Sequence, residues 1–254
     1  MLQYQYEKVT SVEEGVRRLL TVRDVEIPEF ELLRRPEGYY TDVLVYDGKK
    51  IPLFPKRYDP RMNNMRGYGM KAVYENCILN TISFAGNDVS LDEIMYYELD
   101  LAEYVLGTRV TKITAFINGG ACNLLAKTEN GAVAGLELGA TMAPGTIPQI
   151  NHRLITKHGA ATDRTVNNVV EQSGVYLFSA SDPRPVAYDD GEYYLYGLTV
   201  EESMLATFIQ AVLLGRISAD ALIEQDKHLR ELLLAAHKSA ECGKSVPVSA
   251  KEAE

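Results

Sequence analysis

Residues 90–107 read Ser-Leu-Asp-Glu-Ile-Met-Tyr-Tyr-Glu-Leu-Asp-Leu-Ala-Glu-Tyr-Val-Leu-Gly, and the expected fold is built around this segment. Its apolar and tyrosine positions, Ile94, Tyr97, Leu101, Tyr104 and Val105, recur every three or four residues and form one stripe on a helix. Ser is a favoured residue before the first turn of a helix, and Gly is favoured after the last turn. The stretch therefore predicts an amphipathic helix over residues 91–106.

Segments typical of β-strands follow this helix, at 110–117, 123–128, 132–138, 149–156, 174–179 and 192–196. Asn130-Gly131 separates the second and third segments and predicts a tight hairpin. Two capped helices, 200–214 and 219–242, are expected near the end of the chain. Strands in succession, flanked by helices, predict an α+β fold with a large open, mostly antiparallel β-sheet covered by helices on one face.

The first 90 residues are expected to form an extension that packs on a main domain of residues 91–248, with a tail at 249–254. Ser11 is expected to cap a short helix over 12–22. Residues 40–54 predict a β-hairpin with an Asp47-Gly48 turn, and Pro52 puts its second arm at a sheet edge. Residues 55–70 show neither a strand nor a helix period, which predicts a long loop.

The composition argues against several classes of partner. The formal net charge is −9, from 26 Lys+Arg and 35 Asp+Glu, which disfavours a nucleic acid or a membrane surface. The start of the chain lacks a signal-peptide pattern, and no stretch approaches the roughly 20 apolar residues of a membrane span, so a cytoplasmic protein is expected. The three cysteines and four histidines show no zinc-site spacing, and no metal is predicted.

The order of these motifs resembles the C-terminal domain of the Gfo/Idh/MocA oxidoreductases. The matching segments are 99–107, the hairpin 128–138, the turn 158–160 and the closing stretch 235–246. The resemblance implies a large open sheet that binds a sugar, a cyclitol or a related substrate on one side. It also implies that the outer face of the sheet pairs with another subunit.

The chain departs from this family in its nucleotide-binding part. Family members carry a Rossmann domain whose glycine-rich turn approaches the pyrophosphate of the dinucleotide. Here Gly67-Tyr68-Gly69 lacks a third glycine and a βαβ context. The roughly 90 residues before the region of resemblance are also too few for a Rossmann domain. The Glu-Lys-Pro segment with the family's catalytic lysine is absent too. We expect no cofactor on this chain, and NAD(P) only where a partner subunit supplies it.

Three residues are catalytic candidates. The family commonly carries Asp and, four residues later, His before its Asp-Leu-Ala stretch, and Glu93 and Tyr97 stand at these positions here. The two share one helix face, but Tyr is a poorer base than His at neutral pH. The alternative for Tyr97 is packing on the apolar stripe. His152 is the third candidate, on a strand where Arg153 points to the opposite face.

The candidates for substrate binding are polar residues outside regular structure or next to His152. Arg61, Asn64 and Arg66 belong to a cluster suited to hydroxyls or a carboxylate. The alternative is a solvated or interface loop. Asn118 opens an Asn-Gly-Gly turn after a strand, and such a sequence more often forms a simple turn than a ligand-binding loop. Arg153 is the fifth candidate.

Three functions remain open from the sequence. The first is a Rossmann-less relative that binds a sugar- or cyclitol-like molecule as a subunit, in a homo-oligomer or beside a full-length oxidoreductase. The second is a stand-alone acid/base enzyme, an isomerase or lyase acting on a sugar derivative. The third is a structural dimer that associates through its tyrosine-rich sheet, since the chain has 16 Tyr.

Overall fold

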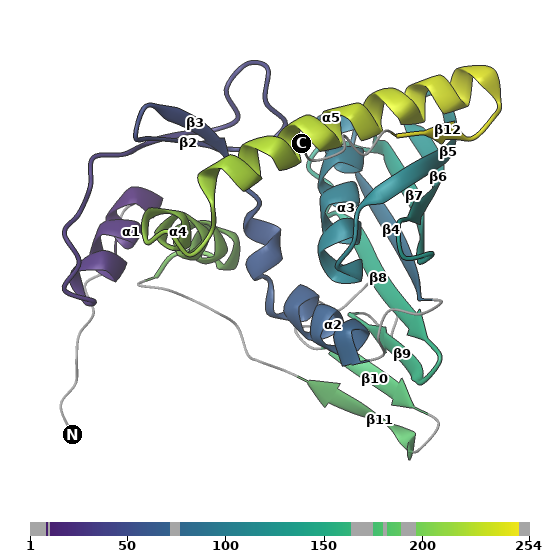
Figure 1. The fold of residues 1–254 in the computed structure, drawn as a ribbon, viewed down its shortest axis with the longest axis horizontal. Helices are drawn as coiled ribbons and strands as arrows, with labels where there is room; N and C mark the ends of the chain where they lie inside the picture. The colour runs from purple at the N-terminus through teal and green to yellow at the C-terminus, as the bar shows by residue number, and fades with distance from the viewer. Residues whose placement is uncertain are drawn as a thin grey trace. The chain divides into compact units, whose positions relative to one another are not determined.

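The computed structural model describes residues 9, 11–71, 77–163, 175–179, 182–188 and 197–248 (Figure 1). The chain divides into two compact units. One comprises Met1–Asp59 and Gly191–Asp226, and the other comprises Pro60–Asp190 and Lys227–Glu254.

The second unit is built on a nine-stranded sheet in the order β11-β10-β9-β8-β4-β7-β6-β5-β12. Its strands are β4 (Ile78–Gly86), β5 (Val110–Asn118), β6 (Ala121–Thr128), β7 (Val133–Met142), β8 (Gln149–Thr156), β9 (Gly159–Thr162), β10 (Val175–Ser179), β11 (Asp182–Tyr188) and β12 (Val246–Pro247). Neighbouring strands are antiparallel except for β4 and β7, which are parallel. The predicted α+β fold with a mostly antiparallel sheet is confirmed.

Strand β4 lies at the centre of the sheet but was not predicted. Its inward residues include the polar Thr81 and Ser83, which are 2% and 5% exposed, whereas Ile78 and Ile82 on the other face are each 42% exposed. Apolar and polar residues therefore do not alternate by face, and the usual strand signal is lost. The predicted strand at 192–196 lies outside the described residues.

Helices cover one face of this sheet (Figure 1). Helix α3 (Leu91–Leu106) contacts β4 and β7. Ser90 caps it by accepting a hydrogen bond from the Glu93 amide at 3.1 Å, and Gly107 ends it with a φ of 65°, as predicted. Helix α5 (Ala219–Cys242) reaches β5, where Oγ of Ser239 accepts from the amide of Ala115 at 2.9 Å.

Residues 60–71 form helix α2 (Pro60–Lys71), where the sequence predicted part of a long loop. That prediction was wrong because tertiary contacts outweigh the weak helix propensity of Asn and Gly. Met62 and Met65 are 2% and 0% exposed, so one side of the helix is buried. The Tyr104 hydroxyl on α3 donates to Oδ1 of Asn63 at 2.6 Å. Arg66 donates to the Tyr104 carbonyl and stacks over its ring.

The first unit contains α1 (Val12–Thr21), β1 (Glu31–Leu33), β2 (Val43–Tyr46), β3 (Lys49–Pro52), the 3-10 helix η1 (Pro55–Tyr58), α4 (Val200–Leu213) and the start of α5. The predicted hairpin is confirmed, with Asp47 and Gly48 at φ of 49° and 69°. Pro52 lies on β3, at the edge of the three-stranded sheet. Helix α4 begins with a capping box formed by Thr199 and Glu202.

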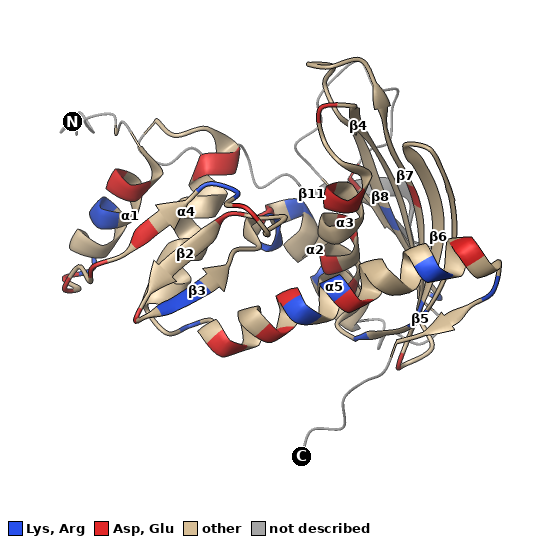
Figure 2. Cartoon of the chain, turned by 90° about the horizontal axis from the view of Figure 1, so that it is seen from above, with Lys and Arg blue, Asp and Glu red and all other residues tan. Residues whose placement is uncertain are grey.

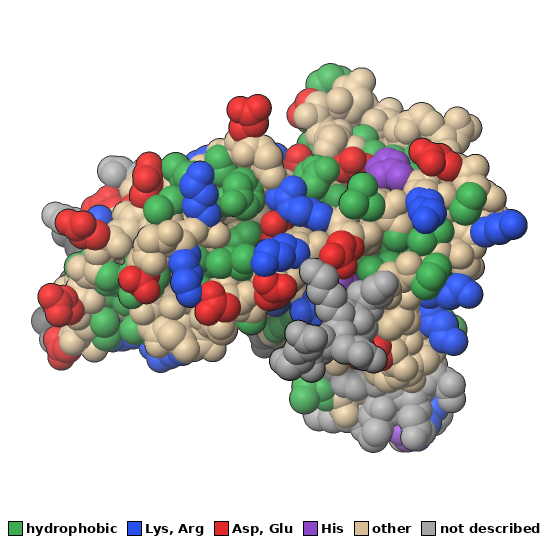
Figure 3. Space-filling model, turned by 45° about the horizontal axis from the view of Figure 1, so that its top comes forward, with side chains coloured by type: hydrophobic (Ala, Val, Ile, Leu, Met, Phe, Trp, Pro, Cys, Tyr) green, Lys and Arg blue, Asp and Glu red, His purple; other side chains and the backbone are tan. Residues whose placement is uncertain are grey.

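The surface carries exposed apolar residues on one face of the large sheet and mixed charges elsewhere. On the sheet face opposite the helices, Ile82, Phe116 and Leu125 are 42%, 67% and 57% exposed. Elsewhere the view in Figure 3 shows basic and acidic side chains interspersed. Among the described residues, no helix has both the length and the apolar character needed to cross a membrane.

Candidate functional site

Helix α3 is acidic, and its ribbon carries red segments in Figure 2. It carries Asp92, Glu93, Glu98, Asp100 and Glu103, and no Lys or Arg. Three of these five are buried, with Glu98 1%, Asp100 2% and Glu103 6% exposed. A buried carboxylate is costly unless it is paired and hydrogen-bonded. The elements that face α3 must therefore supply partners, and histidines do so.

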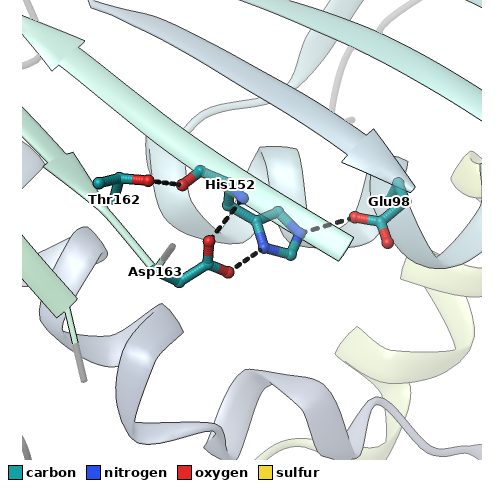
Figure 4. A network of polar contacts seen from close by, with 4 residues as sticks. All are labelled: Glu98, His152, Thr162 and Asp163. Carbon is teal, nitrogen blue, oxygen red and sulfur yellow. Dashed lines mark hydrogen bonds and ion pairs between the residues drawn. The ribbon is translucent and has the colours of Figure 1, made fainter. Parts of the chain in front are cut away.

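His152 on β8 lies between two buried carboxylates (Figure 4). Its Nε2 is 3.0 Å from Oε2 of Glu98, and its Nδ1 is 2.7 Å from Oδ2 of Asp163. Both ring nitrogens can donate only in the charged imidazolium, and carboxylates only accept. The arrangement therefore favours a positively charged His152.

The backbone around His152 is fixed by the same neighbours. The His152 amide donates to Oδ1 of Asp163 at 2.7 Å, and Oγ1 of Thr162 donates to the His152 carbonyl at 2.9 Å. Asp163 thus bonds the ring and the main chain of one residue. The ring cannot turn without breaking charged hydrogen bonds, which are stronger than neutral ones.

The electrostatic surroundings keep His152 charged. Burial alone would lower its pKa, but the charges of Asp163 and Glu98 and their hydrogen bonds outweigh burial and raise the pKa to about 10. At neutral pH neither ring nitrogen is free to take up a proton. The predicted catalytic residue His152 thus has the geometry of a fixed cation that ties α3 to β8.

Two further histidines, both on α5, pair with α3. Nε2 of His228 lies 2.7 Å from Oε1 of Glu103, which also accepts from the Val110 amide at 2.7 Å. Nε2 of His237 lies 2.7 Å from Oδ1 of Asp92. Three of the chain's four histidines thus pair with carboxylates of α3.

The three pairs differ in their access to solvent. The side chains of His152, His228 and His237 are 5%, 15% and 44% exposed. Asp92, the partner of His237, is 35% exposed. A dissolved molecule can therefore reach the Asp92–His237 pair more readily than the other two.

The catalytic candidates Glu93 and Tyr97 lie on α3, each next in sequence to a carboxylate that pairs with a histidine. Glu93 is half-buried in the first turn. Tyr97 is half-buried, and its ring meets that of the fully buried Tyr96 edge to face at 6.0 Å. The packing alternative for Tyr97 is thus compatible with its position, and its part in catalysis stays a prediction.

The predicted substrate-binding residues fall on two sides of the sheet. Arg61, Asn64 and Arg66 lie on α2, which contacts α3. Arg66 is already engaged by the ring and carbonyl of Tyr104.

Arg153 and Asn118 lie elsewhere. Arg153 is exposed while its neighbour His152 is buried, as the strand alternation predicted. Asn118 is exposed at the end of β5, and it alternates in step with the exposed Phe116. A small ligand held beside α3 would not reach Arg153, because the sheet separates the two.

Sequence reasoning missed Glu98, Asp163, Asp92 and His237. One signal for Asp163 existed in the β8–β9 hairpin. Arg153 pairs with Thr162 in this hairpin, and continuing the register by one step sets His152 opposite Asp163. No comparable local pattern links α3 with His152 or α5, because those contacts depend on tertiary packing.

Two glycine-containing segments, α2 and the connection from β4 to α3, are unsuited to the pyrophosphate of a dinucleotide. Gly67 and Gly69 lie inside α2, where helical hydrogen bonds occupy the backbone. The turn from β4 to α3 has a single glycine, Gly86, and leads to Asp92 and Glu93 in the first turn of the helix. These carboxylates would repel a phosphate at that helix N-terminus.

Within the described residues, no group of three or more His, Cys, Asp and Glu side chains is placed to hold a metal ion. The pairs on α3 bring carboxylates and imidazoles together two or three at a time, in hydrogen bonds with each other. Their chemistry is that of proton donors and acceptors.

Neither a protein-family model nor a curated protein sequence matches the chain. Solved structures do match. A probable dehydrogenase from Thermotoga maritima aligns with a TM-score of 0.53 and 18% identity, over 77% of this chain and 63% of that one. Levoglucosan dehydrogenase, in complex with NADH and levoglucosan, aligns with a TM-score of 0.60 and 16% identity, over 77% and 65%.

An oxidoreductase from Agrobacterium radiobacter, in complex with NAD+, L-tartaric acid and magnesium, aligns with a TM-score of 0.59 and 14% identity. That alignment covers 94% of this chain and 70% of the other. The chain spans less than two thirds of the length of the first two structures. At these identities the likeness establishes the fold, which agrees with the resemblance read from the sequence: the chain shares its fold with solved oxidoreductases.

Proposed function

We propose that this chain binds a sugar- or cyclitol-like molecule on the helix-covered side of its large sheet and serves as the substrate-binding part of an oxidoreductase assembly. The observation that carries the proposal is the acidic helix α3, which brings carboxylates and histidines together on that side in a fold shared with levoglucosan dehydrogenase. Carboxylates and imidazoles are suitable partners for the hydroxyls of a polyol.

A cofactor, where one acts, would come from outside the described residues. The glycines of α2 and the acidic first turn of α3 are unsuited to a dinucleotide pyrophosphate. We therefore propose that any NAD(P) is held by a partner subunit, such as a full-length oxidoreductase. The membership of the Gfo/Idh/MocA family, as a C-terminal domain without its Rossmann domain, is part of this proposal.

The exposed apolar side chains on the outer sheet face support an oligomer. Phe116 and Leu125 lie on the neighbouring strands β5 and β6, and Ile82 lies on β4. Asn123 and Glu137 separate Ile82 from Phe116 in the strand register, so Phe116 and Leu125 form the apolar pair on this face, and exposed apolar residues that cluster are characteristic of interaction surfaces. We propose that this face pairs with a second copy or with the oxidoreductase subunit.

The test of binding is calorimetric titration of the full chain with levoglucosan, L-tartrate and myo-inositol. The proposal expects saturable binding of at least one of these compounds. Absence of binding for all three, with the protein folded by circular dichroism, would contradict it. Sodium sulfate serves as a control for nonspecific anion effects.

The second candidate function is a stand-alone acid/base enzyme acting on a sugar derivative. The observation that favours it is the solvent-accessible Asp92–His237 pair beside Glu93. A ketose incubated in D2O would then exchange the hydrogen next to its carbonyl faster with the protein than without it. Exchange at the buffer rate would rule this candidate out.

A further inference from the structure

The pair Asp92–His237 differs from the His152 contacts of α3 because one ring nitrogen of His237 is left without a hydrogen-bond partner among the described residues. His152 uses both ring nitrogens, and its side chain is 5% exposed. In His237 only Nε2 is bonded, to Oδ1 of Asp92 at 2.7 Å. Within the described residues Nδ1 of His237 has no hydrogen-bond partner, and the side chain is 44% exposed.

The partner of Nε2 fixes the chemistry of Nδ1. A carboxylate accepts hydrogen bonds and does not donate, so Nε2 carries the hydrogen. In the neutral ring, Nδ1 is then an acceptor, and in the charged ring it is a donor. A ring oriented by Asp92 therefore offers one defined polar atom to solvent, which suits the hydroxyl of a ligand.

Asp92 lies at the start of α3, near the large sheet. It lies in the first turn of α3, where the positive end of the helix dipole stabilises a carboxylate. Asp92 also lies close enough to β6 to act on Cys122. Burial of the Cys122 thiol and, to a smaller extent, the negative charge of Asp92 raise the pKa of that thiol to about 11. Cys122 pairs with Ile117, the residue before Asn118. The strand registers place the first turn of α3 at the sheet end that carries the Asn118 turn, because Gly86 at the end of β4 pairs with Met142, and Ala121 pairs with both Gly139 and Asn118.

We propose that Asp92 and His237 form a hydroxyl-binding subsite for a polyol or sugar, in which Nδ1 of His237 accepts a hydrogen bond from a ligand hydroxyl. Asp92 acts as the positioning residue because it fixes the orientation and the hydrogen of the ring. This inference deepens the proposed function and rests on it. It assigns the contact to two residues that lie 145 positions apart in the chain.

The test uses the full chain, and levoglucosan as the probe. Titration of the wild type is compared with that of the variants His237→Gln and Asp92→Asn. Loss of the hydrogen bond from the ligand to the imidazole should weaken binding roughly 2- to 12-fold in His237→Gln. In the wild type, the ring proton signals of His237 should shift on titration, and they should shift less in Asp92→Asn.

His158→Gln is the matched control, because His158 lies in the exposed turn after β8. It should bind as the wild type does. If the wild type binds and His237→Gln binds equally well, the subsite is refuted while the proposed function stands. If the wild type does not bind levoglucosan but binds another polyol, the same variants are tested with that polyol. If it binds none, both inferences fail.

Discussion

His152 and Asp163 lie opposite each other across the β8–β9 hairpin, with Nδ1 of His152 2.7 Å from Oδ2 of Asp163. Glu98 on α3 is the third residue of this buried network and lies within hydrogen-bond distance of the other ring nitrogen, Nε2. One ion pair is therefore local to the hairpin, and the other fastens the hairpin to the helix. The buried His152 cation therefore helps to hold helix α3 against the sheet. The network supports the proposed ligand-binding side of the sheet but is itself shielded from solvent.

Removal of His152 should destabilise the protein strongly. His152→Ala leaves Glu98 and Asp163 buried without their cation, and such a loss costs about 3–5 kcal/mol in the free energy of unfolding. Urea unfolding measures the change. The control is Arg153→Ala, since this neighbour is exposed and a surface substitution changes stability by about 0.5 kcal/mol or less. Equal stabilities for the two variants would contradict the account.

The stability of the wild type should fall with rising pH between neutral and alkaline values. The charges of Asp163 and Glu98, opposed by burial, raise the pKa of His152 to about 10, above the unfolded value of about 6.5. The folded state therefore binds more protons, and its advantage is complete below about pH 6.5 and lost as the pH rises through about 10. Urea unfolding at several pH values measures this slope. His152→Ala should lack that part of it, and an unchanged slope would refute a charged His152.

Helix α2 should depend on its contacts with α3. Tyr104→Phe removes the hydrogen bond to Asn63 at 2.6 Å, which is worth about 1 kcal/mol. We expect faster cleavage by trypsin at Arg61 and Arg66, followed by mass spectrometry. Met70→Ala on the same helix is the control because Met70 is 57% exposed. Cleavage rates that do not differ between the two variants would argue against this role of Tyr104.

The outer sheet face should determine the oligomeric state. Phe116→Lys and Leu125→Lys place charges on the exposed apolar strands β5 and β6 and should shift an oligomer towards the monomer in native mass spectrometry. Ile147→Lys, on a loop residue that is 81% exposed, should leave the mass unchanged. A wild type that is already monomeric at micromolar concentration would dismiss this interface.

The sequence predicted the elements whose signals are local. The Ser90 cap, the Gly107 terminus and the Asn130-Gly131 turn are determined by neighbouring residues, and the structure has all three. Helix α2 was missed because burial of Met62 and Met65 against other elements stabilises it, rather than a periodic pattern. Strand β4 was missed because Thr81 and Ser83 face inward.

The candidate site was less predictable than the fold. His152 was identified, but its partners Glu98 and Asp163 lie 54 and 11 residues away in the chain. The pair Asp92–His237 joins two helices that no sequence spacing connects. Side chains that meet only through tertiary packing leave no periodic signal in the sequence. The pairing of α3 carboxylates with histidines is therefore visible only in the three-dimensional structure.

The proposed function depends on which side of the sheet binds a polyol. Calorimetric titration with levoglucosan would compare Tyr97→Phe combined with Glu93→Gln, on the helix-covered side, with Arg153→Ala on the opposite face. We expect binding to weaken at least about tenfold, which corresponds to about 1.4 kcal/mol, in the first variant and to stay unchanged in the second. Loss of binding in Arg153→Ala alone would place the ligand on the outer face and contradict the account.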